Sequence, residues 1–217
     1  MASFTKTGKT IVAVARNYVA HAKELGNATP EVPFYFFKPV SSYLCSGGKI
    51  LLPVKHTVHH EVELAVVVGK TAHRVHRNQA MEHVAGYAAA IDVTDRTAQE
   101  EAKSLGRPWA LAKGRDTFCP VTDFVPAHEV PDPHDVELEL RVNETIRQKD
   151  STKLMIFRIP VLLEAITSAV TLHPGDVVLT GTPSGVNTLE HGDKVSVCMR
   201  TGDKVLAEGF WECVTDG

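Results

Sequence analysis

Several features that would place the chain in a special class are missing from its 217 residues. No dense run of Lys and Arg marks a nucleic-acid surface, and the net charge of −3 gives no reason to expect a polyanionic partner. No apolar stretch approaches the roughly 20 residues that cross a bilayer, and the N-terminus lacks the hydrophobic region of a signal peptide. These absences predict a soluble protein that binds a small molecule, with no nucleic acid and no membrane as partner.

Paired cysteines are also missing. The four cysteines form no C-x-x-C pair and no Cys/His group of the kind that a zinc site needs, so we expect reduced intracellular thiols at Cys45, Cys119, Cys198 and Cys213. The compartment stays open, because no acidic residue precedes Glu24 and the N-terminus mixes Lys and Arg with Ser and Thr, as organellar presequences do. A cytoplasmic or a mitochondrial location fits this pattern.

Short β-prone runs dominate the remaining pattern. Hydrophobic residues make up 43% of the chain, which is enough for a full core, and no repeat or long polar linker interrupts it. Expected strands cover residues 10–15, 34–39, 61–68, 88–93, 137–142, 176–180, 194–199 and 205–211. Expected helices are few and short, over residues 19–25, 79–84, 94–105 and 160–168, and residues 125–133 read as a surface connection. The pattern indicates a mixed, β-rich α+β fold in a single domain over residues 1–217.

Two glutamates stand two residues apart at the beginning of a strongly apolar run. On a strand, the side chains of Glu61 and Glu63 point to the same face, where their negative charges repel each other. Burying both is costly unless a cation neutralises them, and carboxylate oxygens favour Mg²⁺, Mn²⁺ or Ca²⁺ over zinc. The alternative is an edge strand with a solvated charged face, which the pair taken alone favours.

A third carboxylate follows another apolar run. Asp92 comes directly after Ala88-Ala89-Ala90-Ile91 and just before an expected helix, so it can converge with the two glutamates on one ion. Asp is also a good N-cap residue, and the pattern does not decide between the two roles.

Other reactive side chains occur at helical spacing. His21 and Glu24 lie three residues apart, so the carboxylate can orient and charge the imidazole for acid/base chemistry, although an exposed helix pair is the alternative. Arg96 and Gln99 share a helix face in the same way, and Lys113 follows an apolar segment. Each of these residues taken singly is more typical of a protein surface.

A Gly-rich turn follows the expected strand at residues 176–180. Its sequence, Thr180-Gly181-Thr182-Pro183-Ser184-Gly185, exposes backbone amides and hydroxyls to an anionic ligand but lacks the lysine of a P-loop. A plain turn explains the glycines without any ligand.

Five motifs, taken in order, resemble the fumarylacetoacetate hydrolase superfamily over nearly the whole chain. They are Arg16-Asn17-Tyr18-x-x-His21-x-x-Glu24, His60-Glu61-x-Glu63, Ile91-Asp92-x-Thr94-x-Arg96-x-x-Gln99, Leu111-Ala112-Lys113 and Thr180-Gly181-Thr182-Pro183-x-Gly185-Val186. The short length and residues 37–39 and 155–157 are most similar to the fumarylacetoacetate hydrolase domain-containing subfamily, whose members act as acylpyruvases and oxaloacetate decarboxylases.

The resemblance implies a β-roll of mixed sheets with a few short helices, commonly assembled as a homodimer. It implies an Mg²⁺ or Mn²⁺ ion held by Glu61, Glu63 and Asp92. It further implies catalytic roles for His21, Glu24 and Lys113, and substrate binding by Arg16, Arg96, Gln99 and Thr182. The implied reactions are metal-dependent cleavage of acylpyruvates to pyruvate and a carboxylic acid, and decarboxylation of oxaloacetate.

One departure from the family pattern bears on the substrate. The long hydrolase that names the family has an additional N-terminal domain and a fourth acidic ligand seven positions before its catalytic histidine, where this sequence has Val14. Both differences argue against fumarylacetoacetate as the substrate. Two alternatives remain, namely an isomerase or decarboxylase of the homoprotocatechuate-pathway type acting on longer diacids, and a catalytically silent family member.

Overall fold

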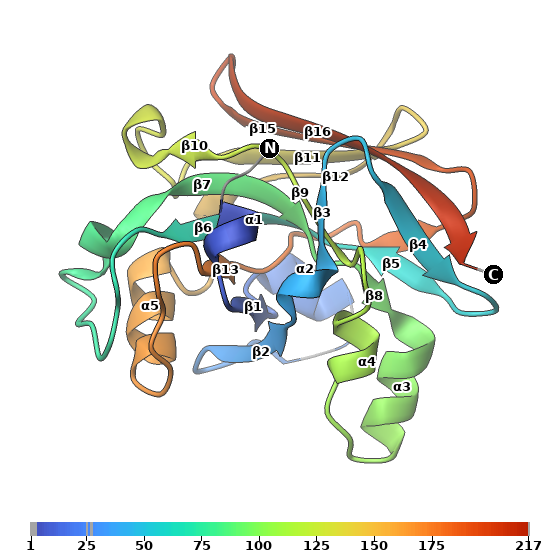
Figure 1. The fold of residues 1–217 in the computed structure, drawn as a ribbon, viewed down its shortest axis with the longest axis horizontal. Helices are drawn as coiled ribbons and strands as arrows, with labels where there is room; N and C mark the ends of the chain where they lie inside the picture. The colour runs from blue at the N-terminus through green and yellow to red at the C-terminus, as the bar shows by residue number, and fades with distance from the viewer. Residues whose placement is uncertain (1–3, 25, 27, 217) are drawn as a thin grey trace.

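Three β-sheets form the body of the part of the chain that the computed structural model describes, which is residues 4–24, 26 and 28–216 (Figure 1). The largest sheet has the order β2 (Phe34–Lys38), β1 (Ile11–Ala15), β13 (Val177–Leu179), β6 (Val62–Val68), β7 (Val84–Ile91), β9 (Cys119–Val121) and β3 (Tyr43–Cys45), with β10 (Val125–Pro126) also paired to β7. The second sheet has the order β12 (Thr145–Ser151), β11 (Glu137–Val142), β15 (Lys194–Thr201), β16 (Lys204–Asp216) and β4 (Lys49–Pro53). The third joins β14 (Asn187–Leu189), β5 (Val58–His60) and β8 (Thr94–Asp95).

The sheets are mixed. Strand β1 pairs parallel with β13, β16 with β4, and β3 with β9, whereas β6 pairs antiparallel with both of its neighbours. The expected mixed, β-rich α+β class with few short helices is therefore confirmed. In the described residues, no helix is long and apolar enough to cross a membrane.

The five-stranded sheet lies over one face of the eight-stranded sheet, as Figure 1 shows. Val62, Leu64 and Val66 of β6 belong to the core cluster between the two sheets, together with Leu138 and Leu140 of β11. Ala65 and Val67 belong to a second cluster on the opposite face of β6. This strand is buried on both faces, which explains its continuous apolar run, and alternation places Glu63 on the face away from the five-stranded sheet.

Short helices occupy the connections. They are α1 (Phe4–Thr7), α2 (Val19–Glu24), α3 (Arg96–Ser104), α4 (Ala110–Lys113) and α5 (Ile159–Thr167), with 3₁₀ turns at Val40–Ser42, Ala80–His83, Ala127–Glu129 and Thr152–Leu154. The α-helix expected over residues 79–84 is thus only a 3₁₀ turn, and Leu25, expected to continue α2, lies outside the described residues. The expected surface connection at 125–133 contains β10 and a 3₁₀ turn, and it buries Val125 and Val130.

Candidate active site

Three carboxylates meet at one edge of the eight-stranded sheet. Asp92 directly follows β7, Glu61 directly precedes the antiparallel β6, and the backbone N–H of Asp92 donates to the carbonyl of Glu61 at 2.8 Å. Glu63 is the second residue of β6, and one oxygen from each of the three carboxylates lies within 4.8 Å of the others. The arrangement fits a single metal ion.

The solvated-edge alternative for the glutamates is wrong. Strand β6 lies in the interior of its sheet, and Glu61 and Glu63 are only 6% and 1% exposed. The expected strand is also too long by one residue, because Glu61 occupies the break between β5 and β6. Both carboxylates nevertheless reach the same cavity.

Asp92 does not cap the following helix, because a neighbouring residue takes that role. Asp95 is the N-cap of α3 and accepts a hydrogen bond from the N–H of Ala98 at 2.9 Å. The Asp92 carboxylate, 1% exposed, faces the two glutamates and two lysines instead. The helix expected from residue 94 begins at Arg96, because residues 94 and 95 pair with β5 as β8.

Basic side chains surround the carboxylates. The Nζ of Lys113 lies 2.6 Å from Oδ2 of Asp92 and 3.1 Å from Oε2 of Glu61. Arg96 donates from Nη2 to Oε1 of Glu61 at 2.5 Å, and Lys38 donates from Nζ to Oδ1 of Asp92 at 2.7 Å and to the carbonyl of Lys113. The buried charges of Glu61 and Asp92 are therefore paired, as burial of ions requires.

The two glutamates differ in pKa. Burial tends to raise the pKa of Glu61, but the charges of Lys113 and Arg96 outweigh it and hold that pKa well below its ordinary value. Burial raises the pKa of Glu63 well above its ordinary value, and the charges of Asp92 and Glu61 add to the effect. For Lys113, burial is outweighed by Asp92 and Glu61, which raise its pKa. Glu63 is thus the carboxylate whose negative charge is least compensated by the protein.

The Gly-rich turn contacts this glutamate directly. The N–H of Gly181 donates to Oε2 of Glu63 at 2.6 Å, with Gly181 at φ +94°. A Cβ on Gly181 would lie 2.6 Å from the Cβ of Asn17, so only glycine fits. The amide of the turn therefore binds an internal carboxylate, a possibility that the sequence pattern left open.

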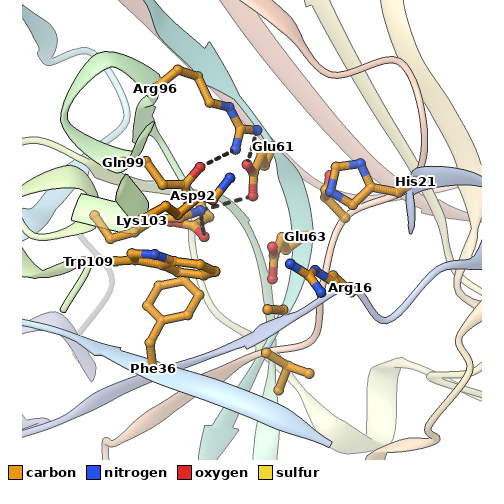
Figure 2. A pocket seen from close by; sticks show the side chains of 14 residues that line it. Arg16, His21, Phe36, Glu61, Glu63, Asp92, Arg96, Gln99, Lys103 and Trp109 are labelled. Atoms are coloured by element: carbon orange, nitrogen blue, oxygen red, sulfur yellow. Dashed lines mark hydrogen bonds and ion pairs between the residues drawn. The ribbon is translucent and has the colours of Figure 1, made fainter. Parts of the chain in front are cut away.

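The three carboxylates line a small cavity of about 40 Å³. Figure 2 shows Arg96, Gln99, Trp109 and Phe36 on one side of it, His21 and Arg16 on the other, and the two glutamates between them. Nine of the ten expected site residues line it, namely Arg16, His21, Glu61, Glu63, Asp92, Arg96, Gln99, Lys113 and Thr182. The structure thus brings together side chains that lie far apart in the sequence.

Glu24, the tenth expected residue, stands behind His21. Its Oε2 lies 3.4 Å from Nδ1 of His21, and its carboxylate accepts from the N–H of Gly185 at 3.1 and 3.3 Å. His21 is only 4% exposed, so the alternative of an exposed helix pair is wrong. The carboxylate can orient the imidazole whose other nitrogen is free to face the cavity.

The expected substrate-binding residues are held by internal contacts. Arg96 donates from Nη1 to Oε1 of Gln99 at 2.8 Å and from Nε to Nδ1 of His59 at 3.1 Å. Thr182 Oγ1 accepts from Nε2 of Gln148 at 2.8 Å. Arg16 has a positive φ of 59°, a strained conformation for a non-glycine residue that is common at functional sites.

Several residues of the cavity and its support were not expected from the sequence. Phe36, Trp109 and Lys103 line the cavity, with the rings of Phe36 and Trp109 in edge contact at 5.8 Å. Lys38 and Gln148 lie behind the lining, both at most 2% exposed. For Lys38 the sequence offered one signal, namely its place at the end of the aromatic run 34–37. A lysine among aromatic residues needs a buried anion as its partner.

Comparison with known proteins agrees with this geometry. Residues 10–213 match the family model described as fumarylacetoacetate (FAA) hydrolase C-terminal. The chain belongs to the fumarylacetoacetate hydrolase family. It shares 50% identity over 192 residues with a mitochondrial oxaloacetate tautomerase of Arabidopsis thaliana, covering 88% of this chain and 86% of the relative. It shares 47% identity over 204 residues with a mitochondrial oxaloacetate decarboxylase of Dictyostelium discoideum, covering 93% of each.

Solved structures of this fumarylacetoacetate hydrolase family have the same fold. A fumarylpyruvate hydrolase from Pseudomonas aeruginosa, in complex with Mn²⁺ and pyruvate, superposes with a TM-score of 0.87 at 31% identity, covering 96% of this chain and 91% of that one. A 5-carboxymethyl-2-hydroxymuconate delta-isomerase from Mycobacterium smegmatis gives 0.84 at 38% identity, covering 97% and 80%. The resemblance that the five sequence motifs indicated is therefore confirmed.

Proposed function

We propose that this chain is an Mg²⁺- or Mn²⁺-dependent enzyme that acts on short 2-oxo acids, with oxaloacetate and acylpyruvates as its substrates. The observation that carries the proposal is the convergence of three buried carboxylates with a lysine, an arginine and, across the same cavity, a histidine backed by a carboxylate. Relatives named for oxaloacetate chemistry and a neighbour in complex with Mn²⁺ and pyruvate support it.

The residues present fit a hard divalent cation. Glu61, Glu63 and Asp92 offer oxygen ligands within reach of one centre, and none of these three residues offers a nitrogen or sulfur ligand. Burial raises the pKa of Glu63, the charges of Asp92 and Glu61 add to the effect, and a bound dication would neutralise the negative charge that these neighbours supply. When bound, the ion would supply a Lewis acid that polarises the 2-oxo group of a substrate.

The chain's own residues would bind and orient the substrate. Arg96, Gln99, Arg16 and Thr182 face the cavity with donors suited to carboxylate and carbonyl oxygens. Phe36 and Trp109 form an apolar wall that keeps water from one side of the substrate. The ammonium of Lys113, which stays charged because its pKa is raised, would stabilise negative charge that develops on an enolate oxygen.

His21 would move the proton. Its imidazole faces the cavity and is oriented by Glu24. In an acylpyruvate, His21 would take a proton from a water molecule that attacks the distal carbonyl, and carbon–carbon cleavage would release the pyruvate enolate. In oxaloacetate, loss of the 4-carboxylate as CO₂ would leave the same enolate, which gains a proton at C3.

Keto–enol interconversion of oxaloacetate requires less of the site than either cleavage. It only transfers a proton between C3 and the 2-oxo oxygen, through the enolate of oxaloacetate itself, which keeps the 4-carboxylate. In all three reactions the ammonium of Lys113 would stabilise an enolate oxygen and the imidazole of His21 would carry the proton, which accounts for relatives of which one is named a tautomerase and another a decarboxylase.

The two alternatives are less well supported. Relatives that the chain matches over 86% and 93% of their length are named for oxaloacetate chemistry, which favours a short acid over the longer diacids of the isomerase type. A catalytically silent protein would have no use for the His21–Glu24 pair or for a lysine held beside two carboxylates. We further propose that residues 1–217 form one catalytic domain, that the protein assembles as a homodimer, and that it works in the cytoplasm or in mitochondria.

Turnover with and without metal tests the proposal. Purified protein should release pyruvate from acetylpyruvate, release CO₂ from oxaloacetate or accelerate loss of the oxaloacetate enol absorbance, with Mg²⁺ or Mn²⁺ but not with chelator. His21→Ala should lower kcat by about 100-fold or more, the usual contribution of a general base, while binding Mn²⁺ like the wild type. Turnover unaffected by chelator, or no turnover of any of these substrates, would contradict the proposal.

A further inference from the structure

Gln148 is a buried amide in an otherwise exposed edge strand. Strand β12 pairs only with β11, and Gln148 is the one residue of its seven that is buried, at 1% exposed. A bulge in the pairing with β11 lies next to it, between Leu140 and Arg141. An amide buried in this way needs hydrogen-bond partners on both its oxygen and its nitrogen.

Its four partners come from two other segments. The Oε1 of Gln148 accepts from the backbone N–H of Val62 at 3.0 Å and from Nδ1 of His60 at 2.9 Å. Its Nε2 donates to Oγ1 of Thr182 at 2.8 Å and to the carbonyl of Pro183 at 2.9 Å. Because a backbone N–H only donates and a carbonyl only accepts, these partners fix which end of the amide is which.

The oxygen of Gln148 contacts the residues on both sides of Glu61, namely the backbone of Val62 and the side chain of His60. Strand β13 ends at Leu179, which pairs with Ala65, so Val62 lies beyond the last residue that β13 pairs on that side of β6. Gln148 supplies the acceptor there and also binds His60, so the residues before and after Glu61 are held by one atom. The stretch that carries Glu61 is thereby held by strand β7 on one side, through the bond from the Asp92 N–H to the Glu61 carbonyl, and by Gln148 on the side where β13 has ended.

The nitrogen of Gln148 sets the direction of a hydroxyl. Since Nε2 donates to Thr182, the Thr182 oxygen acts as acceptor in this contact, and its own proton is left to donate into the cavity that it lines. The same turn packs closely on β12, because a Cβ on Gly185 would lie 2.2 Å from the carbonyl oxygen of Arg147. The backbones of the Gly-rich turn and the strand are therefore in direct contact.

We propose that Gln148 is a positioning residue for both halves of the site, placing Glu61 for metal binding and orienting the Thr182 hydroxyl toward the substrate. This inference rests on the proposed function, which assigns those tasks to Glu61 and Thr182. Gln148 itself touches neither metal nor substrate.

Two substitutions of Gln148 distinguish its effect on Glu61 from its effect on the Thr182 hydroxyl. Gln148→Met keeps the approximate volume and removes all four hydrogen bonds. Gln148→Glu keeps an acceptor for Val62 and His60. Its second oxygen loses the hydrogen bond to the carbonyl of Pro183 and accepts the proton of Thr182, which turns that proton away from the cavity. Thr152→Val is the matched control, because Thr152 is also buried and loses two hydrogen bonds, from Val136 N–H and to the carbonyl of Pro133, outside the site.

The measurements are Mn²⁺ titration by electron paramagnetic resonance, steady-state kinetics and thermal unfolding. Gln148→Met should bind Mn²⁺ about 10- to 100-fold more weakly, as for other residues that orient metal ligands. Gln148→Glu should bind Mn²⁺ no more weakly than wild type but raise KM about 10-fold with little change in kcat. In a Thr182→Val background, Gln148→Glu should leave KM unchanged, and Thr152→Val should lower the melting temperature alone.

Wild-type Mn²⁺ affinity and KM in Gln148→Met, with only the loss of stability that Thr152→Val also has, would overturn the inference. So would equal losses of Mn²⁺ affinity in Gln148→Glu and Gln148→Met. Failure of the proposed function can be told apart from failure of this inference. If the wild type shows no turnover, Mn²⁺ titration of Gln148→Met still tests whether Gln148 places Glu61 for metal binding. A wild type that binds no Mn²⁺ would overturn both.

Discussion

Glu63 carries the least compensated charge of the acidic cluster. Lys113 and Arg96 pair with Glu61, and two lysines pair with Asp92, whereas the contact shown for Glu63 is the backbone N–H of Gly181. Its pKa is raised because burial and two neighbouring carboxylates disfavour its negative charge. In the metal-free protein this residue therefore opposes folding, and it becomes favourable only when a cation is bound.

Replacing Glu63 should separate metal binding from folding. Glu63→Ala should weaken Mn²⁺ binding by more than the roughly 10- to 100-fold lost when an outer partner is removed, and should lower activity with it. Glu63→Gln should do the same while keeping an oxygen for the N–H of Gly181, so its metal-free melting temperature should equal or exceed that of wild type. Calorimetric Mn²⁺ titration and thermal unfolding in chelator measure both quantities. An unchanged Mn²⁺ affinity would remove Glu63 from the ligand set.

At the scale of elements, helix α3 links the site to a second buried acid. Asp95 is fully buried, caps the helix through Ala98, and pairs with His56 at 2.7 Å and Arg115 at 2.9 Å. The next residue, Arg96, is the first of the helix and contacts Glu61. The direction in which α3 leaves the sheet therefore decides where the guanidinium points.

Loss of the Asp95 cap should lower both stability and activity. Asp95→Ala should lower the free energy of unfolding by about 2 kcal/mol, the upper range for a lost N-cap, and should lower kcat/KM because the first turn carrying Arg96 loosens. Asp95→Asn keeps the cap acceptor but not the charge that His56 and Arg115 pair with, so it should lie between Asp95→Ala and wild type. Urea unfolding and kinetics provide the measurements.

A control lies at the other end of the same helix. The exposed Ser104 donates to the carbonyl of Glu101 at 2.8 Å, far from the carboxylates. Ser104→Ala should leave kcat/KM unchanged. If Asp95→Ala keeps wild-type kcat/KM despite lower stability, the capped first turn of α3 does not position Arg96.

Across the whole molecule, buried imidazoles should make stability depend on pH. Burial, with Arg96 adding to it, lowers the pKa of His59 to about 4, and burial also lowers the pKa of His60. Unfolded histidines titrate near 6.5, as an approximate reference value. Between about pH 6.5 and 4, the unfolded chain therefore binds protons at these histidines that the folded chain does not, so their contribution to stability falls as the pH falls through this window. Glu63, whose pKa is raised, contributes in the opposite direction in the metal-free protein.

Urea unfolding in chelator at pH 7.5 and pH 5 tests this expectation. His59 alone should account for about 1 to 2 kcal/mol of the loss, since it is partly exposed and its interactions are screened. His59→Gln keeps an acceptor for Arg96 but does not titrate, so it should lose less stability than wild type over the same interval. Equal losses in the two proteins would show that His59 does not carry the effect.

The sequence predicted the main strands well and the short or polar ones poorly. Strand β6 was predicted because both of its faces are apolar, and the order β6–β7 placed Asp92 beside Glu61. Strand β12 was missed because its sequence, Thr-Ile-Arg-Gln-Lys-Asp-Ser, is polar and exposed except at Gln148. The 3₁₀ turn at 80–83 was taken for a helix because a single turn carries the same residue spacing.

The sequence alone determined the family and predicted ten site residues, because motif identity and order survive without coordinates. Tertiary structure decided the burial and the partners of these residues. It depends on which chain segments cover them whether Glu61 and Glu63 are solvated, and whether Asp92 or Asp95 caps α3. It also decided the supporting contacts of Lys38 and Gln148, which join residues 34 or more positions apart and leave no local pattern. Local spacing fixes which groups are available, and only long-range packing fixes their burial, partners and charge.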